Sequence, residues 1–300
     1  MTNKTSHAQN THAQSTHVQS TAAENTDTQN IHLVAGATGT VGREVVRELL
    51  ERGQRVRALT RDASKASFPE GVEAVQGDLR EPASLKAALE GATGLHLITF
   101  SGAYEPLETG PEILALAREA GVRRVTVLHG GGASPLEDAV RAGELDWTVV
   151  KPVEFMGNSL EWAESVRADS TVRAPFTDRL SALVHEGDIG AVIAVALVED
   201  GHAGQEYVVT GPQALTVVEK VATLAEARGS DIALVELTEE QAAAGMRAEG
   251  HEEGLIAWLL DVYKNTPPEG RTVLDTVPRV TGRPARTYAD WAREHAPSFR

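Results

Sequence analysis

The chain has 300 residues, of which 41% are apolar, and its 43 acidic and 28 basic residues give a formal net charge of -15. A surface this acidic repels a phosphate backbone, so we expect no direct nucleic-acid partner. No run reaches the ~20 apolar residues that span a bilayer, and the absence of cysteine excludes disulfides and thiolate chemistry and fits a cytoplasmic protein.

Residues 1–30 differ in composition from the rest of the chain. They are rich in Thr, Gln, Asn, Ser and His, and they repeat a five-residue unit that begins at His7, His12 and His17. Such a segment cannot bury enough apolar area to offset its ordering entropy, so we expect it to be disordered. A spacing of five scatters the three histidines around a helix. We therefore predict no metal site there, and we find no targeting pattern.

From Ile31 on, short apolar runs alternate with segments of helical periodicity. The predicted strands are 31–36, 55–60, 72–76, 94–99, 124–129 and 146–150, and the predicted helices are 40–52, 82–90, 106–120 and 134–143. This order implies parallel strands joined by right-handed crossovers. The predicted fold class is therefore α/β, with a Rossmann doubly wound parallel sheet over residues 31–155.

After Pro152 the rhythm changes, and residues 156–300 are predicted to form a smaller C-terminal α/β substrate lobe, interleaved with the first in one compact unit. Its predicted helices are 157–168, 188–199, 215–228, 238–248, 251–264 and 286–295, and its strands are 171–173, 205–209 and 232–237. The apolar stretch from Ile189 to Val198 is interpreted as a packed helix. We expect the substrate between the lobes, because ligands of open α/β sheets bind outside the carboxyl ends of the strands.

The most informative motif is a set of three glycines at the first turn from strand to helix, Gly36, Gly39 and Gly42. Glycine is used where a side chain would collide with a close neighbour. The helix that follows directs unpaired N–H groups and its positive dipole end at the same point, where a diphosphate fits. We therefore predict a bound dinucleotide. The expected contacts at this turn are Gly36, Thr38, Gly39, Thr40 and Val41.

The ends of the next strands predict the rest of the cofactor site. Arg61 can pair with a 2′-phosphate, so we favour NADPH over NADH; its alternative role is that of a solvated loop residue. Asp62 keeps NADH open, since it either reaches the ribose or caps the next turn. Asp78, followed by Leu79, either accepts a bond from the adenine amino group or caps a turn. The middle of the cofactor is expected to pass Thr99 and Phe100. His129 and Gly130 end the next strand, where the glycines leave room for the nicotinamide or the substrate, and Pro152 is a further expected cofactor contact.

These motifs resemble the NmrA-like branch of the atypical short-chain dehydrogenases/reductases. The resemblance rests on the glycine turn, on Gln76-Gly77-Asp78-Leu79, on the segment 145–158 and on matching segments up to 281–284, so it spans about residues 31–300. It implies an NAD(P)H-binding Rossmann domain beneath a substrate cleft. The family includes quinone and other small-molecule reductases, and also cofactor-binding regulators with little or no turnover.

The chain departs from the standard short-chain dehydrogenases in one respect: it has no Tyr-x-x-x-Lys pair. The segment between Gly132 and Trp147, where that pair would lie, contains no tyrosine. The candidate catalytic residues are therefore His129, Tyr104 and Glu154. Each has an alternative role. His129 would bond to the backbone, Tyr104 would pack against its neighbours, and Glu154 would form a salt bridge to Lys151.

Four residues are candidates for the substrate wall. Phe155, Met156 and Trp162 would form an apolar surface for a flat substrate, or else pack in the core. His185 would line the cleft, or else cap the helix that follows it.

The expected function is an NADPH-dependent reductase of a small, hydrophobic, conjugated substrate: a quinone, enone, ketone or imine. Hydride transfer needs position and exclusion of water more than a protein acid. One alternative is a catalytically weak NAD(P)-binding redox sensor or regulator. The other is a biosynthetic enzyme of this fold that catalyses a cyclisation or rearrangement. A homodimer is compatible with the sequence.

Overall fold

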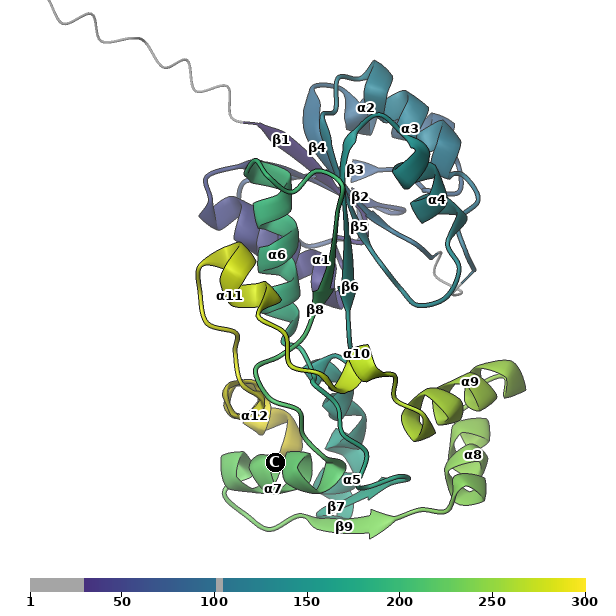
Figure 1. The fold of residues 1–300 in the computed structure, drawn as a ribbon, viewed down its shortest axis with the longest axis vertical. Helices are drawn as coiled ribbons and strands as arrows, with labels where there is room; N and C mark the ends of the chain where they lie inside the picture. Colours follow the sequence, from purple (N-terminus) through teal and green to yellow (C-terminus); the bar gives the residue numbers. More distant parts are fainter. Residues whose placement is uncertain (1–29, 101–104) are drawn as a thin grey trace, which may run out of the picture.

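A seven-stranded parallel sheet forms the larger part of the molecule in the computed structural model, which describes residues 30–100 and 105–300 (Figure 1). Our expectations for residues 1–29 and for Tyr104 fall outside these ranges. The strand order is β3-β2-β1-β4-β5-β6-β8. The winding therefore reverses between β1 and β4. The strands are β1 Ile31–Val34, β2 Arg55–Thr60, β3 Val72–Gln76, β4 Ala92–Ile98, β5 Arg124–Leu128, β6 Asp146–Pro152 and β8 Gln205–Val209.

One face of the sheet is covered by helices that come from the first half of the chain. Leu85, Ile113 and Leu136 are buried there against Leu95 and Val127 of the strands. Figure 1 shows this helical layer to the right of the sheet. Its helices are the 3-10 helix η1 Pro82–Leu85, α2 Lys86–Leu89, α3 Gly110–Glu119 and α4 Pro135–Ala142.

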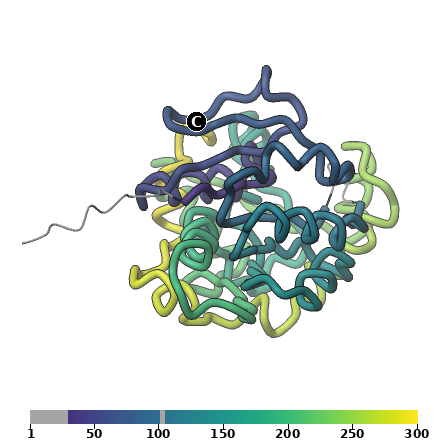
Figure 2. The backbone as a smooth tube through the Cα atoms, turned by 90° about the horizontal axis from the view of Figure 1, so that it is seen from above, coloured from purple at the N-terminus to yellow at the C-terminus, as the bar shows by residue number. Residues whose placement is uncertain are grey.

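The opposite face is covered by α1 Thr40–Glu51, α6 Glu186–Val198 and α11 Thr276–Thr281. Nearly every residue of α6 is buried, so the apolar stretch from Ile189 is a packed helix, as predicted. In Figure 2 the green α6 and yellow α11 segments lie on one side of the purple-to-teal strands, and the light-green α8–α9 segment projects on the other. Across the described ranges, no helix combines the length and the apolar character needed to cross a membrane.

The lower part of Figure 1 is a smaller lobe with its own two-stranded parallel sheet, β7–β9, and a core centred on Tyr288 and Trp291. Because α6 and β8 return to the large sheet, the C-terminal half of the chain contributes to both parts. The lobe consists of the 3-10 helices η2 Met156–Trp162 and η3 Ala296–Phe299, β7 Thr171–Ala174, β9 Ala233–Glu236, α5 Ala163–Asp169, α7 Val217–Arg228, α8 Glu239–Ala248, α9 Glu253–Lys264, α10 Pro268–Arg271 and α12 Tyr288–His295.

The predicted fold class is confirmed, and the differences concern the bounds of elements, the division of two helices and a short helix that was not predicted. The helix expected from residue 106 begins only at Gly110, because the Thr109 hydroxyl donates to the Leu79 carbonyl and Pro111 occupies the first turn. Residues 82–90 and 157–168 each divide into a 3-10 turn followed by a short α-helix. The helix α11 was not predicted; it ends at Gly282, whose φ of 68° continues no helix.

Candidate cofactor and active site

A pocket of about 520 Å³ lies at the carboxyl ends of β1, β2 and β4, where the strand order reverses. Open α/β sheets bind nucleotides at such a reversal. Six of the predicted cofactor residues line it together: Gly36, Thr38, Arg61, Asp78, Leu79 and Phe100. The sequence placed them on four separate strand ends, and parallel pairing brings those ends to one edge.

The glycine turn makes a close backbone packing that excludes side chains. Gly36 has a φ of 65°, which L-residues rarely adopt. A Cβ on Gly42 would lie 2.0 Å from the Gly36 carbonyl oxygen, so α1 packs directly against the turn. No side chain caps α1 at Gly39 and its first turn has no acidic residue. The N–H groups of Thr40 and the buried Val41 are therefore directed, with the helix dipole, at the position predicted for a diphosphate.

Charged side chains crowd the end of the pocket beyond β2 and β3. Asp62 accepts bonds from the backbone N–H (3.1 Å) and the hydroxyl (2.6 Å) of Ser64, which supports its capping alternative. Asp78 binds Arg80 at 2.7 Å, and this hydrogen bond holds the pKa of its carboxyl below the ordinary value, so Asp78 remains an acceptor. In contrast, no carboxylate of the described ranges lies within ion-pair distance of the exposed Arg61. The guanidinium is available to a phosphate.

The ends of β4 and β5 meet beyond the pocket. The Gly130 N–H donates to the Thr99 hydroxyl at 3.1 Å, and a Cβ on Gly130 would lie 1.9 Å from the Phe100 ring. Glycine is required there because the ring occupies the space. Thr99 and Gly130 therefore hold the Phe100 wall of the pocket, whereas Pro152 lies at the end of β6 and is not one of the residues that line it.

His129 follows β5, and its side chain hydrogen-bonds to a carboxylate. The alternative role that we considered for it was a hydrogen bond to the backbone. Its Nδ1 lies 2.6 Å from a carboxylate oxygen of Glu137 on α4. Arg141 donates to the other oxygen of Glu137 at 2.8 Å. The sequence analysis missed this contact. The one feature of the sequence that pointed to this contact is the spacing of Glu137 and Arg141. They lie four residues apart, and therefore on one face of a helix.

Glu154 occupies a buried ionic cluster with residues far away in sequence. It binds Arg179 at 2.8 Å and Lys220 at 3.0 Å, while Lys151 pairs with Glu206 instead. Glu154 therefore forms a salt bridge, as its alternative role predicted, but its partners are Arg179 and Lys220 and not Lys151. Burial raises the pKa of Glu154, but the charges of Lys220 and Arg179 outweigh it and lower that pKa to about 2. A carboxylate this acidic is a poor base at neutral pH, which favours the structural role.

Of the predicted substrate wall, two residues belong to the core of the smaller lobe. Met156 is 1% and Trp162 8% exposed, and both pack in that core, which favours the packing alternative. Phe155 is half-buried against the layer of α1 and α6. The half-exposed Trp258 of α9, which the sequence analysis did not single out, lies beside the glycine loop: a Cβ on Gly131 would be 3.6 Å from its ring.

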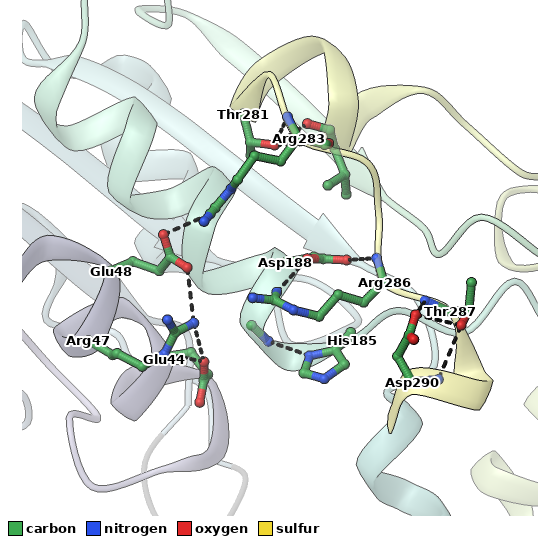
Figure 3. A network of polar contacts seen from close by, with 12 residues as sticks. Glu44, Arg47, Glu48, His185, Asp188, Thr281, Arg283, Arg286, Thr287 and Asp290 are labelled. Atoms are coloured by element: carbon green, nitrogen blue, oxygen red, sulfur yellow. Dashed lines mark hydrogen bonds and ion pairs between the residues drawn. The ribbon is translucent and has the colours of Figure 1, made fainter. Parts of the chain in front are cut away.

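His185 begins α6 within a polar network that joins α1, α6 and the C-terminal segment (Figure 3). Its Nδ1 accepts a hydrogen bond from the Gly187 N–H at 2.9 Å, and its Nε2 lies 3.2 Å from Glu294. Beside it, Asp188 accepts two bonds from Arg286, at 2.7 and 2.6 Å. These contacts support the helix-capping alternative for His185. Within the described ranges, no cluster of three or more His, Asp or Glu side chains is arranged to hold a metal ion.

The chain is similar in sequence to known NAD(P)H-binding proteins. Residues 36–200 match the family model of NAD(P)H-binding domains. The chain is 38% identical over 282 residues to an NAD(P)H azoreductase of Xenophilus azovorans, with 89% of this chain and 98% of that protein covered. It is 36% identical, with the same coverage, to a (4-alkanoyl-5-oxo-2,5-dihydrofuran-3-yl)methyl phosphate reductase of Streptomyces griseus.

The fold is shared with a solved structure, that of the NADPH-dependent quinone oxidoreductase QOR2 of Escherichia coli in complex with NADPH. The TM-score is 0.75 at 23% identity, and 88% of this chain and 99% of that chain are covered. The chain shares its fold with the solved structure of NmrA, belongs to the family of NAD(P)H-binding domains, and is an NAD(P)H-dependent oxidoreductase.

Proposed function

We propose that this protein uses NADPH to reduce a small, hydrophobic, conjugated acceptor such as a quinone, enone, ketone or imine, without a Tyr–Lys pair. The observation that carries the NADPH preference is Arg61, an exposed guanidinium on the wall of the dinucleotide pocket that forms no ion pair within the described ranges, although its charge interacts with that of Asp78. A 2′-phosphate would give it a charge-assisted pair.

The residues of the site fit this cofactor. The free N–H groups at the start of α1 would hold the diphosphate, Asp78 would accept from the adenine amino group, and Phe100 would lie against the middle of the dinucleotide. When bound, NADPH supplies a hydride. The chain then has to position the acceptor, exclude water and deliver one proton, so that the acceptor gains two electrons and two hydrogens. We assign proton delivery to His129, with Tyr104 as the second candidate.

The acceptor class is supported by the names of two relatives that are 38% and 36% identical to this chain over 282 residues. One is named for an azo substrate, and the name of the other describes an unsaturated ring conjugated to carbonyl groups. An azo compound and such an unsaturated ring are both flat, electron-poor π-systems. Acceptors of this kind take up a hydride readily. Phe155 and Trp258 are the partly exposed aromatic residues that we propose for contact with such a substrate.

The test is to mix the purified chain with NADPH or NADH and a panel of azo dyes, quinones, enones and imines, and to follow the absorbance of reduced nicotinamide. Oxidation with several acceptors, faster with NADPH, is the expected result. Tight NADPH binding with no oxidation would instead indicate a redox sensor, and a product isomeric with its substrate would indicate a rearrangement enzyme. A cytoplasmic location and a homodimer stay predictions.

A further inference from the structure

Three side chains form a continuous polar contact at the carboxyl end of β5: His129, Glu137 and Arg141. The His129 Nδ1 lies 2.6 Å from one carboxylate oxygen of Glu137, and Arg141 donates to the other at 2.8 Å. Ser134 fixes the start of α4, because its hydroxyl accepts the Glu137 N–H at 3.2 Å. The Glu137 side chain is 3% exposed and that of His129 is 24% exposed. Glu137 is therefore too buried to touch a ligand, whereas the exposed part of the His129 ring can do so.

We propose that Glu137 is the positioning residue of a proton-delivering His129, and that Arg141 holds this carboxylate ionised. The proposal rests on the proposed function, since it explains how the acceptor receives its proton. It places Glu137 in the segment between Gly132 and Trp147 that contains no tyrosine, and His129 just before that segment.

The chemistry follows from the atoms in contact. An ionised carboxylate only accepts hydrogen bonds, so the proton in the 2.6 Å contact belongs to Nδ1 of His129. The imidazolium then carries its second proton on Nε2, on the side of the ring away from Glu137. Nε2–H gives that proton to the acceptor atom that becomes negative as the hydride arrives. The neutral imidazole regains a proton from water, and Glu137 stays ionised throughout.

The surroundings keep Glu137 charged. Burial raises the pKa of its carboxyl, but the hydrogen bonds and charges of His129 and Arg141 outweigh it and hold that pKa below the ordinary value. The charged groups that face the pair are Arg141 and Asp138 from α4, Glu206 from β8 and Lys151 from β6, linked by contacts from Arg141 to Asp138 and Glu206 and from Lys151 to Glu206. On the side of β4, the neighbouring residue is Thr99, which carries no titratable group.

The loop after His129 leaves the ring accessible. Gly131 and Gly132 have φ values of 89° and 80°, a conformation that side-chain-bearing residues rarely adopt, so no Cβ covers this loop. A Cβ on Gly132 would meet nothing within 4 Å. The Trp258 ring bounds the loop at Gly131. A flat acceptor could lie between this ring and His129.

The experiment compares Glu137→Gln, His129→Gln and their double variant with Glu144→Gln, a matched control whose exposed carboxylate pairs with Arg118 among the residues that the structure describes. We expect kcat to fall roughly 10²-fold or more in His129→Gln, since a general acid contributes that much. In Glu137→Gln we expect a loss of about tenfold or more, with KM and the NADPH dissociation constant within about twofold. The double variant should be no slower than His129→Gln alone, because the residues act as one unit.

Two further readouts separate positioning from folding. The pH above which kcat/KM declines should move lower in Glu137→Gln and not in Glu144→Gln, and Glu137→Asp should recover part of the loss. Nitrogen NMR of the ring, assigned with His129→Gln, should show a protonated, hydrogen-bonded Nδ1 in the wild type and a weaker hydrogen bond at Nδ1 in Glu137→Gln, where a neutral amide oxygen replaces the carboxylate. Because NMR needs no turnover, it decides the proposal even if no acceptor is reduced. An unprotonated Nδ1, or additive losses in the double variant, would overturn it.

Discussion

The buried ionic cluster around Glu154 allows the sharpest stability prediction. Lys220 is 1% exposed, and the hydrogen bond of its ammonium is to Glu154 at 3.0 Å. Arg179 donates two bonds to the same carboxylate, at 2.8 and 3.2 Å. Glu154→Gln keeps the shape of the side chain and removes its charge, which leaves the buried ammonium of Lys220 without its ion-pair partner.

The magnitude follows from the carboxyl group itself. Its pKa is lowered from 4.5 to about 2, a difference that corresponds to roughly 3 kcal/mol of folding stability at neutral pH. Removing one partner of a buried ion pair typically costs about 3–5 kcal/mol, which agrees. Because the folded-state pKa is depressed, this stability is fully present above pH 4.5 and is lost as the pH falls toward 2.

Urea unfolding, followed by tryptophan fluorescence at several pH values, measures this effect. Glu154→Gln should lower the free energy of unfolding by about 3 kcal/mol at pH 7, and the difference from the wild type should shrink as the pH approaches 2. Glu144→Gln should change it by less than about 0.5 kcal/mol, as at most exposed positions. Glu154→Gln/Lys220→Met should recover part of the loss, since no ammonium remains unpaired. An offset that is equal at all pH values would refute the electrostatic explanation.

The remaining predictions concern the cofactor and the acceptor. Arg61→Ala should weaken NADPH binding in calorimetry by roughly 10- to 100-fold, as expected for a lost charge-assisted bond of about 1.5–3 kcal/mol, and leave NADH almost unchanged; equal weakening of both would exclude the 2′-phosphate contact. Gly42→Ala should abolish measurable NADPH binding, because the new Cβ would overlap the Gly36 carbonyl oxygen, whereas Gly245→Ala, where nothing lies within 4 Å, should bind normally. Trp258→Ala should raise KM for aromatic acceptors roughly three- to tenfold, the worth of one aromatic pair, and a changed NADPH affinity instead would contradict its role at the acceptor.

The sequence by itself determined the parallel sheet and the nucleotide turn, because both depend on local rules. Most strands of the large sheet are apolar runs between breakers. Gly39 and Gly42 are needed where α1 packs against the backbone of the turn, and Gly36 is needed for its positive φ. Such requirements can be recognised from individual residues and their close neighbours in the sequence. The position of the pocket followed as well, since the carboxyl ends of parallel strands always share one edge.

The partners of the charged residues were decided only by the tertiary structure. Glu154 meets Lys220 from 66 residues away and Arg179 from 25, and neither spacing leaves a mark in the sequence. The His129–Glu137 contact spans a loop whose path depends on two glycines in unusual conformations. A charged side chain can pair with any opposite charge that lies near it. Which pairs form is therefore decided by the packing, because packing buries some charged groups together and leaves others in water.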